Sequence, residues 1–192
     1  MKFQGTNKFN QNISTVWYNL NNPDSIKLCI NGCSEFLEIS KNVYKAKINI
    51  NLGPVNANFS SDIKIKDIVD LKSYVIEANG SAGHLGFGKG TVKVELVEDG
   101  KDTLLNYSAD TQISGKIAQL GARLIEGSVK KNTNSFFRNF ELLLQKNKPV
   151  ESSTDLKRST LLSKTIKKHK YLFIFLSFFL ILVFNFLKFY NE

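Results

Sequence analysis

The sequence predicts an α+β fold in which a curved antiparallel sheet wraps around one long C-terminal helix, followed by a C-terminal transmembrane helix. Three observations predict it. Apolar and polar residues alternate through successive segments between residues 44 and 113, which is the period of strands with one buried face. From Ser114 the apolar spacing becomes helical. Residues 171–187 are apolar apart from Ser177 and Asn185, which indicates a membrane-spanning helix.

The N-terminal segment predicts one strand and two short helices. Residues 3–9 alternate enough for a first strand. Residues 12–20 indicate a helix capped by Asn12 or Ser14, because either side chain can accept a hydrogen bond from the free backbone N–H groups of the first turn. Pro23 suits the first position of a second short helix, where its fixed φ is helical and its missing N–H is not needed.

Alternation then dominates and predicts about six antiparallel strands. Gly53-Pro54 turns the chain between the first two of the clear patterns, and Asp99-Gly100 is a strong hairpin signal. The clear patterns cover residues 44–52, 55–65, 71–79, 90–98 and 105–113.

A helix of about thirty residues, well above the usual length, is predicted from Ser114 onward. Strand, two short helices, antiparallel strands and one long helix is the element order of a helix-grip fold, which leaves an apolar cavity between sheet and helix. A glycine inside a helix costs about 1 kcal/mol relative to alanine. Gly121 and Gly127 therefore indicate close approach of the sheet or of a bound molecule. Close packing around an empty interior is the alternative.

The glycine-rich segment 83–90 nearly matches a phosphate-binding loop. Two features exclude that site. Gly90 stands where the motif needs a hydroxyl, and a strand pattern follows instead of the helix whose N-terminus would hold phosphate. We interpret the segment as a flexible hairpin or bulged strand at the mouth of the sheet. His84 lies within it, either as an ordinary loop residue or as a ligand contact at the mouth.

Composition argues against several kinds of chemistry. With only His84 and His169, the second in a basic stretch outside the domain, a multi-histidine zinc site is excluded. Cys29 and Cys33 are too few for a disulfide scaffold and do not form a redox C-x-x-C motif. Paired carboxylates for acid–base chemistry are not evident, and no serine has the surroundings of a nucleophile. We therefore expect no enzymatic activity, no catalytic residues and no metal site.

The net charge of +9 does not indicate nucleic-acid binding. Residues 149–192 carry +4 of it, which leaves +5 spread over the other 148 residues. A nucleic-acid footprint needs clustered Lys and Arg and usually aromatic platforms.

The C-terminal segment is interpreted as an anchor. Residues 171–190 would rise about 30 Å as a helix, which matches a hydrocarbon core. Six Lys or Arg lie between 157 and 170, and only Lys188 follows the apolar run. We therefore expect a ligand-binding domain over 1–146, a polar, basic linker over 147–170 and a transmembrane anchor over 171–190. The positive-inside rule predicts a single-pass protein of the inner membrane with its N-terminal domain in the cytoplasm.

Several motifs resemble one known family over about residues 1–145. The sequence is similar to the CoxG family of carbon monoxide dehydrogenase subunits, which belongs to the START-like (SRPBCC) ligand-binding superfamily. One departure is Asn31, where the family usually has proline. The motifs are Val16-Trp17…Leu20…Pro23…Cys29-Ile-Asn-Gly-Cys33, Gly53-Pro54-Val55-Asn-Ala57-Asn-Phe59, Gly80-Ser-Ala-Gly83 with Gly86-Phe87-Gly88-Lys-Gly90, Ala109-Asp110, Ser114-Gly115-Lys116-Ile-Ala118-Gln119-Leu120-Gly121-Ala-Arg123-Leu124-Ile125, and Phe136-Phe137-x-x-Phe140.

The resemblance implies a non-catalytic, membrane-anchored accessory protein. It would recruit a molybdenum-hydroxylase-type carbon monoxide dehydrogenase to the cytoplasmic membrane and hold an apolar small molecule. No covalent cofactor is implied, and a quinone or other lipid would be the bound group. The alternative is a membrane-tethered carrier of lipid or an apolar metabolite without an oxidoreductase partner. A polyketide-cyclase type of enzyme on the same scaffold is disfavoured, since acid–base residues are not evident. Face and family place these residues in the cavity wall: Phe59, Leu85, Phe87, Leu120, Gly121, Leu124, Ser128 and Phe136.

Overall fold

The computed structural model describes residues 1–146 and has the predicted α+β class. The predicted linker and transmembrane anchor lie outside the described residues. Among residues 1–146, no helix is long and apolar enough to cross a bilayer. The elements are β1 (Lys2–Phe9), α1 (Ile13–Leu20), α2 (Pro23–Cys29), β2 (Cys33–Ser40), β3 (Val43–Leu52), β4 (Val55–Val69), β5 (Ser73–Ser81), the 3₁₀ turn η1 (Gly83–Leu85), β6 (Phe87–Asp99), β7 (Asp102–Ser114), the 3₁₀ turn η2 (Lys116–Leu120) and α3 (Ala122–Lys146).

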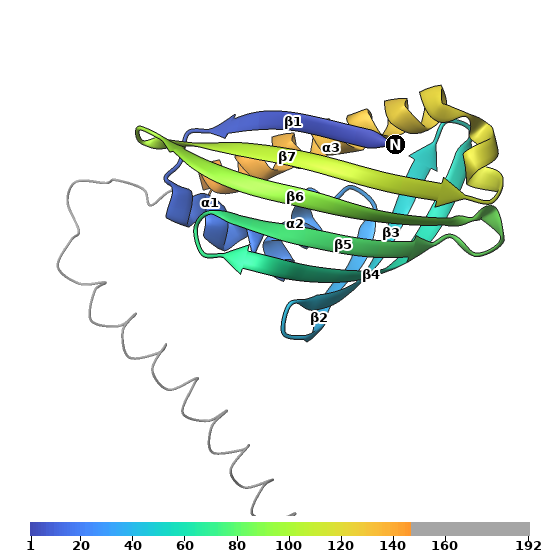
Figure 1. The fold of residues 1–192 in the computed structure, drawn as a ribbon, viewed down its shortest axis with the longest axis horizontal. Coiled ribbons are helices and arrows are strands. Elements are labelled where there is room, and N and C mark those ends of the chain that lie inside the picture. The colour runs from blue at the N-terminus through green and yellow to red at the C-terminus, as the bar shows by residue number, and fades with distance from the viewer. Residues whose placement is uncertain (147–192) are drawn as a thin grey trace, which may run out of the picture. The chain divides into compact units, whose positions relative to one another are not determined.

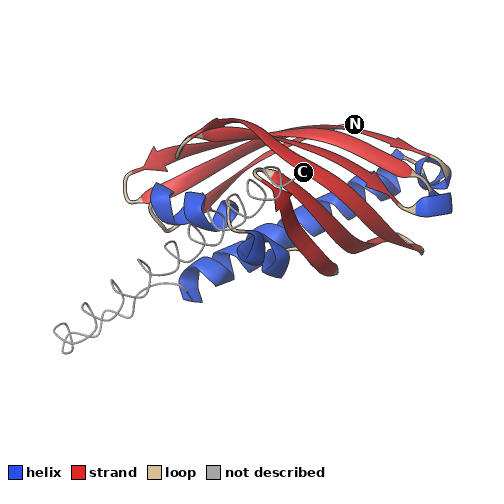
Figure 2. Cartoon of the chain, turned by 90° about the horizontal axis from the view of Figure 1, so that it is seen from below, coloured by secondary structure: helices blue, strands red, loops and turns tan. Residues whose placement is uncertain are grey.

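Seven strands form one antiparallel sheet in the order β1-β7-β6-β5-β4-β3-β2. Strands β2 to β7 pair in chain order, and β1 returns to lie beside β7. The sheet curves around α3, which lies along its concave face (Figures 1 and 2). The helix-grip arrangement predicted from the element order is therefore confirmed.

The edge strand β2 completes the predicted set of about six strands after the short helices, although no alternation pattern indicates its position. Its pairing with β3 is interrupted by register shifts between Cys33 and Glu35 and between Glu38 and Ser40. Each shift moves the following side chains relative to the pleat, so the simple two-residue period is lost.

Both short helices begin where the sequence predicts. The Asn12 side chain accepts a hydrogen bond from the Thr15 backbone N–H at 2.9 Å and caps α1. Asn22 accepts from Asp24 and Ser25 in the same way and caps α2, in which Pro23 takes the first position.

The long helix begins later than predicted. Lys116–Leu120 form the turn η2, and α3 starts at Ala122 and contains 25 residues, not about thirty from Ser114. Gly121 has φ +85 and interrupts the helical backbone between the two. The close-approach argument is wrong for both glycines, because Gly121 lies outside the helix and a Cβ on either Gly121 or Gly127 would meet no atom within 4 Å.

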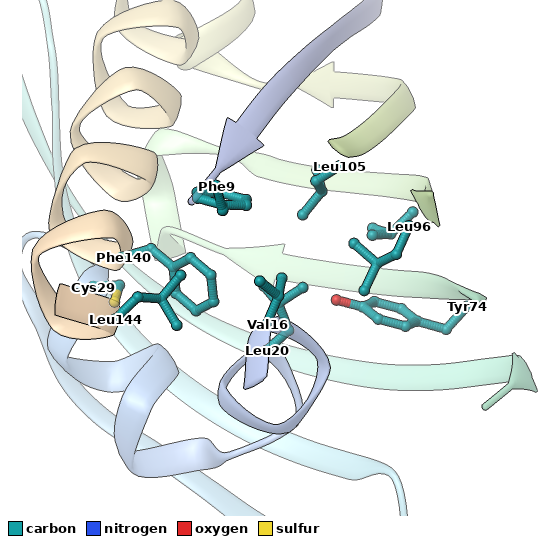
Figure 3. Close-up of a cluster of buried hydrophobic side chains, with 10 residues drawn as sticks. Phe9, Val16, Leu20, Cys29, Tyr74, Leu96, Leu105, Phe140 and Leu144 are labelled. Atoms are coloured by element: carbon teal, nitrogen blue, oxygen red, sulfur yellow. The ribbon is translucent and has the colours of Figure 1, made fainter. Parts of the chain in front are cut away.

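A buried cluster fixes α3 and α1 to one end of the sheet (Figure 3). The rings of Phe9 and Phe140 meet edge-on with centroids 5.3 Å apart, and Leu144 and Val16 pack in the same cluster. Full burial of one such side chain contributes about 1.5–3 kcal/mol, which makes this cluster the main anchor of the helix.

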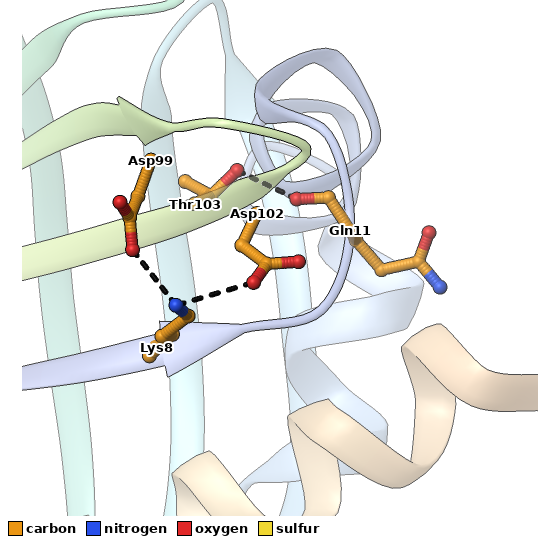
Figure 4. Close-up of polar contacts among 5 residues, drawn as sticks. All are labelled: Lys8, Gln11, Asp99, Asp102 and Thr103. Atoms are coloured by element: carbon orange, nitrogen blue, oxygen red, sulfur yellow. Dashed lines mark hydrogen bonds and ion pairs between the residues drawn. The ribbon is translucent and has the colours of Figure 1, made fainter.

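Polar contacts bind β1 to the β6–β7 hairpin at that same end (Figure 4). The Lys8 ammonium lies 2.8 Å from Asp99 and 3.2 Å from Asp102, and these carboxylates raise its pKa. The buried Thr103 hydroxyl donates to the Gln11 carbonyl oxygen at 2.8 Å. The first strand and its exit toward α1 are thereby held in register.

Candidate ligand-binding cavity

A cavity of about 470 Å³ lies between the concave face of the sheet and α3. Its volume falls within the range of small-molecule sites. Every layer of the domain contributes to the wall. The lining residues are Phe3, Leu20, Ile26, Ile30, Phe36, Ile63, Ile65, Tyr74, Ile76, Val92, Val94, Leu105, Tyr107, Ala109, Thr111, Val129, Asn132, Thr133, Phe136 and Phe137.

Strand periodicity produces the sheet side of this wall. Ile63 and Ile65 on β4 point inward, and the intervening Lys64 is exposed. The antiparallel register places Ile65 opposite Ile76 of β5, which in turn lies opposite Val92 of β6. A band of β-branched side chains therefore crosses the middle of the sheet.

Helical spacing produces the other side. Val129, Thr133 and Phe136 lie within two turns of α3 and reach the cavity. Phe136 stacks on Phe140 at 6.0 Å and meets Phe137 edge-on at 5.3 Å. The aromatic group thus joins the cavity wall to the buried core.

A glycine shapes the wall beside β1. Gly5 lies opposite Tyr107 of β7, and a Cβ at position 5 would stand 2.6–2.8 Å from the Tyr107 ring. Only glycine lets that ring lie over the β1 backbone. The ring then packs 5.6 Å from Phe137 and closes the cavity on this side.

None of the cavity-lining residues is charged. Polar groups come from the phenols of Tyr74 and Tyr107, the hydroxyls of Thr111 and Thr133, and the amide of Asn132. Burial raises the pKa of Tyr74 well above its usual range, so its hydroxyl stays protonated. An ionised ligand would lose its water without gaining a counter-charge, and this arrangement therefore favours neutral, mainly apolar molecules.

The predicted wall residues divide into three groups. Phe136 lines the cavity. Phe59, Leu85 and Leu120 pack instead on a second buried cluster formed by Leu52, Ala57, Ala82 and Ile117. The other four do not line the cavity either: Phe87, Gly121 and Leu124 are exposed, and Ser128 is half-buried. Contact of these seven residues with a ligand stays a prediction.

Sequence reasoning did not assign the β4–β7 residues of the wall to the cavity. Ile63, Ile65 and Leu105 belong to strand patterns whose inward face the alternation identifies. The missing signal is position along the strand, because Phe59 and Ile63 point to the same face of β4 and only Ile63 reaches the cavity. A later helix start would have directed attention to Ile63.

The thiols and carboxylates of the domain are poorly placed for catalysis. Burial raises the pKa of the Cys29 thiol to about 11 and also raises that of Cys33, so neither is a ready thiolate. Glu77 lies 2.5 Å from Lys66, whose ammonium lowers the pKa of that carboxyl. Asp62 is exposed and 3.9 Å from Lys45. His84 is exposed in η1.

Solved structures share this architecture, which defines the chain as a START-like domain. A conserved protein from Geobacillus kaustophilus is 26% identical with a TM-score of 0.72, over 76% of this chain and 96% of that one. A START superfamily protein from Mycobacterium smegmatis is 9% identical with a TM-score of 0.60, over 76% and 97%. The Zhui aromatase/cyclase from Streptomyces sp. R1128 is 10% identical with a TM-score of 0.60, over 80% and 99%.

The family model of the carbon monoxide dehydrogenase subunit named CoxG matches residues 5–145, and the chain belongs to this family. The resemblance stated from the motifs is confirmed. A comparison with curated protein sequences finds no match.

Proposed function

We propose that the protein is a membrane-tethered accessory protein that holds a neutral, quinone-like molecule in its cavity. The observation that carries the proposal is the 470 Å³ cavity without a charged lining residue. A quinone ring is flat and uncharged, and its carbonyl oxygens accept hydrogen bonds from donors such as the Thr133 hydroxyl or the Tyr107 phenol. Its apolar chain suits the Ile and Val band of the sheet.

The proposed tether rests on the sequence beyond the domain. The apolar run 171–190 follows six Lys or Arg placed between residues 157 and 170. Such residues add roughly 1 kcal/mol each of attraction to an anionic leaflet. A single-pass anchor in the inner membrane, with the domain in the cytoplasm, follows from this charge bias.

The proposed protein partner is a molybdenum-hydroxylase-type carbon monoxide dehydrogenase, which the family description supports. The domain would bring this soluble enzyme to the membrane and offer it an apolar electron acceptor. Genes for molybdenum-hydroxylase subunits should then occur in the same genome. Their absence would remove the dehydrogenase role and leave the second candidate, an apolar carrier without that partner, which rests on the same cavity.

We assign no catalytic role to the cavity. A Streptomyces neighbour in the comparison is described as an aromatase/cyclase, so the fold itself is compatible with chemistry. The wall of this cavity contains no carboxylate, histidine, lysine or cysteine to move a proton or act as a nucleophile. Binding is the function that these residues support best.

The test is extraction of the purified full-length chain with organic solvent, followed by mass spectrometry. Ala109 lines the cavity on β7, and its neighbour Ser108 is exposed on the opposite face. Wild type and Ser108→Trp should release one apolar compound near equimolar amount, and Ala109→Trp should release little because the indole fills the site. Val129→Phe provides a second, smaller filling variant. Equal release from all variants would show that the compound comes from surrounding lipid and would contradict the proposal.

A further inference from the structure

The end of the domain where the strands turn toward α3 has an unusual surface. Three neighbouring loops form it: the β3–β4 turn at 52–55, the β5–β6 connection at 81–88, and the segment 114–125 that leads through η2 into α3 (Figure 1). We call these residues the apolar end.

Large apolar side chains are exposed there on a rigid support. Phe87 is 44% exposed and Leu124 is 46% exposed. The position of a Cβ on Gly53 lies 3.5 Å from a methyl group of Leu124, so this side chain rests on the β3–β4 turn. The second buried cluster, which includes Ile117, lies beneath.

Backbone contact between glycines holds the loops together. A Cβ on Gly115 would stand 2.6 Å from the Cα of Gly86, and both glycines have positive φ. The Ala82 N–H donates to the Gly86 carbonyl oxygen at 2.8 Å and closes the β5–β6 connection. The exposed apolar groups are therefore presented by tightly joined loops.

Charge distinguishes this end from the rest of the domain. The apolar end contains no Asp or Glu, and its permanent charges are Lys116 and Arg123, both exposed. The adjoining stretch of β3 and β4 carries uncharged polar residues, namely Asn49, Asn51, Asn56 and Asn58.

The opposite end also exposes apolar groups, but among carboxylates. Val97 is 41% exposed and is followed by Glu98 and Asp99, and Val69 is followed by Asp70. Insertion of that end into a lipid headgroup layer would bring these carboxylates against anionic phosphates. Apolar exposure alone therefore does not select a lipid partner, whereas apolar exposure with only positive charge does.

We propose that the apolar end docks on an anionic bilayer surface, with Phe87 and Leu124 in the headgroup layer and Lys116 and Arg123 on lipid phosphates. The proposal builds on the membrane tether proposed above. The 24 residues 147–170 could span at most about 80 Å, roughly twice the length of about 37 Å that 25 helical residues give α3. The tether length thus allows this contact even though α3 ends at the other side of the domain.

Quenching by brominated lipid tests the contact on the full-length chain. Phe87 and Val97 are exposed near the two ends of the same strand, β6, which makes Val97→Trp a matched control for Phe87→Trp. Wild type supplies the background of the single native Trp17. In vesicles containing brominated phosphatidylglycerol, we expect quenching beyond background for Phe87→Trp and none for Val97→Trp.

Charge removal provides the second arm. Each basic group near an anionic surface contributes roughly fivefold to the binding equilibrium, so Lys116→Gln with Arg123→Gln should weaken docking about 30-fold. Loss of the Phe87→Trp quenching in this background supports the proposal. Equal quenching at positions 87 and 97, or none at 87, overturns it, and the second result would leave a protein partner as the occupant.

Flotation with vesicles at high salt reports the tether separately. A chain that floats without quenching at position 87 keeps its tether and loses this inference. A chain that shows the quenching at low salt but does not float at high salt keeps the inference and loses the tether. Absence of both removes both.

Discussion

The two ends of the sheet are stabilised in different ways. At the end where β1 meets the β6–β7 hairpin, Lys8 lies between Asp99 and Asp102, and Phe140 packs in the buried cluster beneath (Figures 3 and 4). At the apolar end, glycines in backbone contact and a smaller cluster join the loops. The difference separates a stabilising end, rich in long-range contacts, from an end suited to meet something outside the domain.

The largest expected effect is at the stabilising end. Phe140→Ala should lower the free energy of unfolding by about 3–5 kcal/mol, since the ring is fully buried and its loss leaves a cavity. Phe87→Ala, at the exposed apolar end, should cost less than about 1 kcal/mol. Urea unfolding of the full-length chain, followed by Trp17 fluorescence, measures both. Similar costs would remove the distinction between the two ends.

A pH dependence should come from the same buried cluster. Burial raises the pKa of Cys29 from 9.0 to about 11, so the folded state holds this proton more tightly than the unfolded state. The resulting stability is complete below pH 9 and is lost as the pH rises from 9 to 11. It amounts to at most about 3 kcal/mol.

Urea midpoints of wild type and Cys29→Ala between pH 8 and pH 11 measure this contribution. The wild type should lose more stability across that window than the variant does, because tyrosine and lysine titration is common to both. Cys33→Ala keeps the buried thiol and should follow wild type. A wild type and Cys29→Ala that respond identically would contradict the assignment.

Glycine contact at the apolar end gives the next effect. Gly115→Ala should destabilise the fold by about 1–3 kcal/mol, because a Cβ there meets the Gly86 backbone at 2.6 Å and φ is positive. Gly100→Ala is the matched control, since φ is also positive but no atom lies within 4 Å of the added carbon. Thermal unfolding should place the control closer to wild type. Equal shifts would mean that φ alone matters.

The smallest effect is expected for Lys8→Ala. Its ion pairs with Asp99 and Asp102 are solvent-exposed, and exposed pairs contribute little because water screens them. Thermal unfolding at low and at high salt should show a slight destabilisation that salt removes. A loss comparable to that of Gly115→Ala would mean that the β1–hairpin contact has been underestimated.

Much of the fold could be predicted from the sequence, and the cavity only in part. Alternation identified the long strands because one face of each is buried, and Asn12 and Pro23 marked the short helices through local chemistry. The start of α3 was missed because Gly121 adopts a positive φ that no periodicity reports. Edge strand β2 was missed because register shifts break its pattern.

The position of the site depended on those errors. With the helix drawn from Ser114, its small and apolar residues, such as Leu120 and Gly121, became the expected cavity wall. The structure places Leu120 on the second cluster and the cavity nearer the middle of the sheet, around Ile65 and Tyr74. Which stretch of an inward face meets open space is a tertiary property, set by where α3 begins and how the sheet curves.

Native mass spectrometry of the full-length chain tests the central claim, that the cavity holds one neutral apolar molecule. The probe is the uncharged N-phenyl-1-naphthylamine, compared with its sulfonated analogue 8-anilinonaphthalene-1-sulfonate. Wild type and Ser108→Trp should each bind one neutral molecule, Ala109→Trp should bind none, and the sulfonate should bind far more weakly, since none of the lining residues is charged. Equal binding of both probes, or undiminished binding by Ala109→Trp, would contradict it.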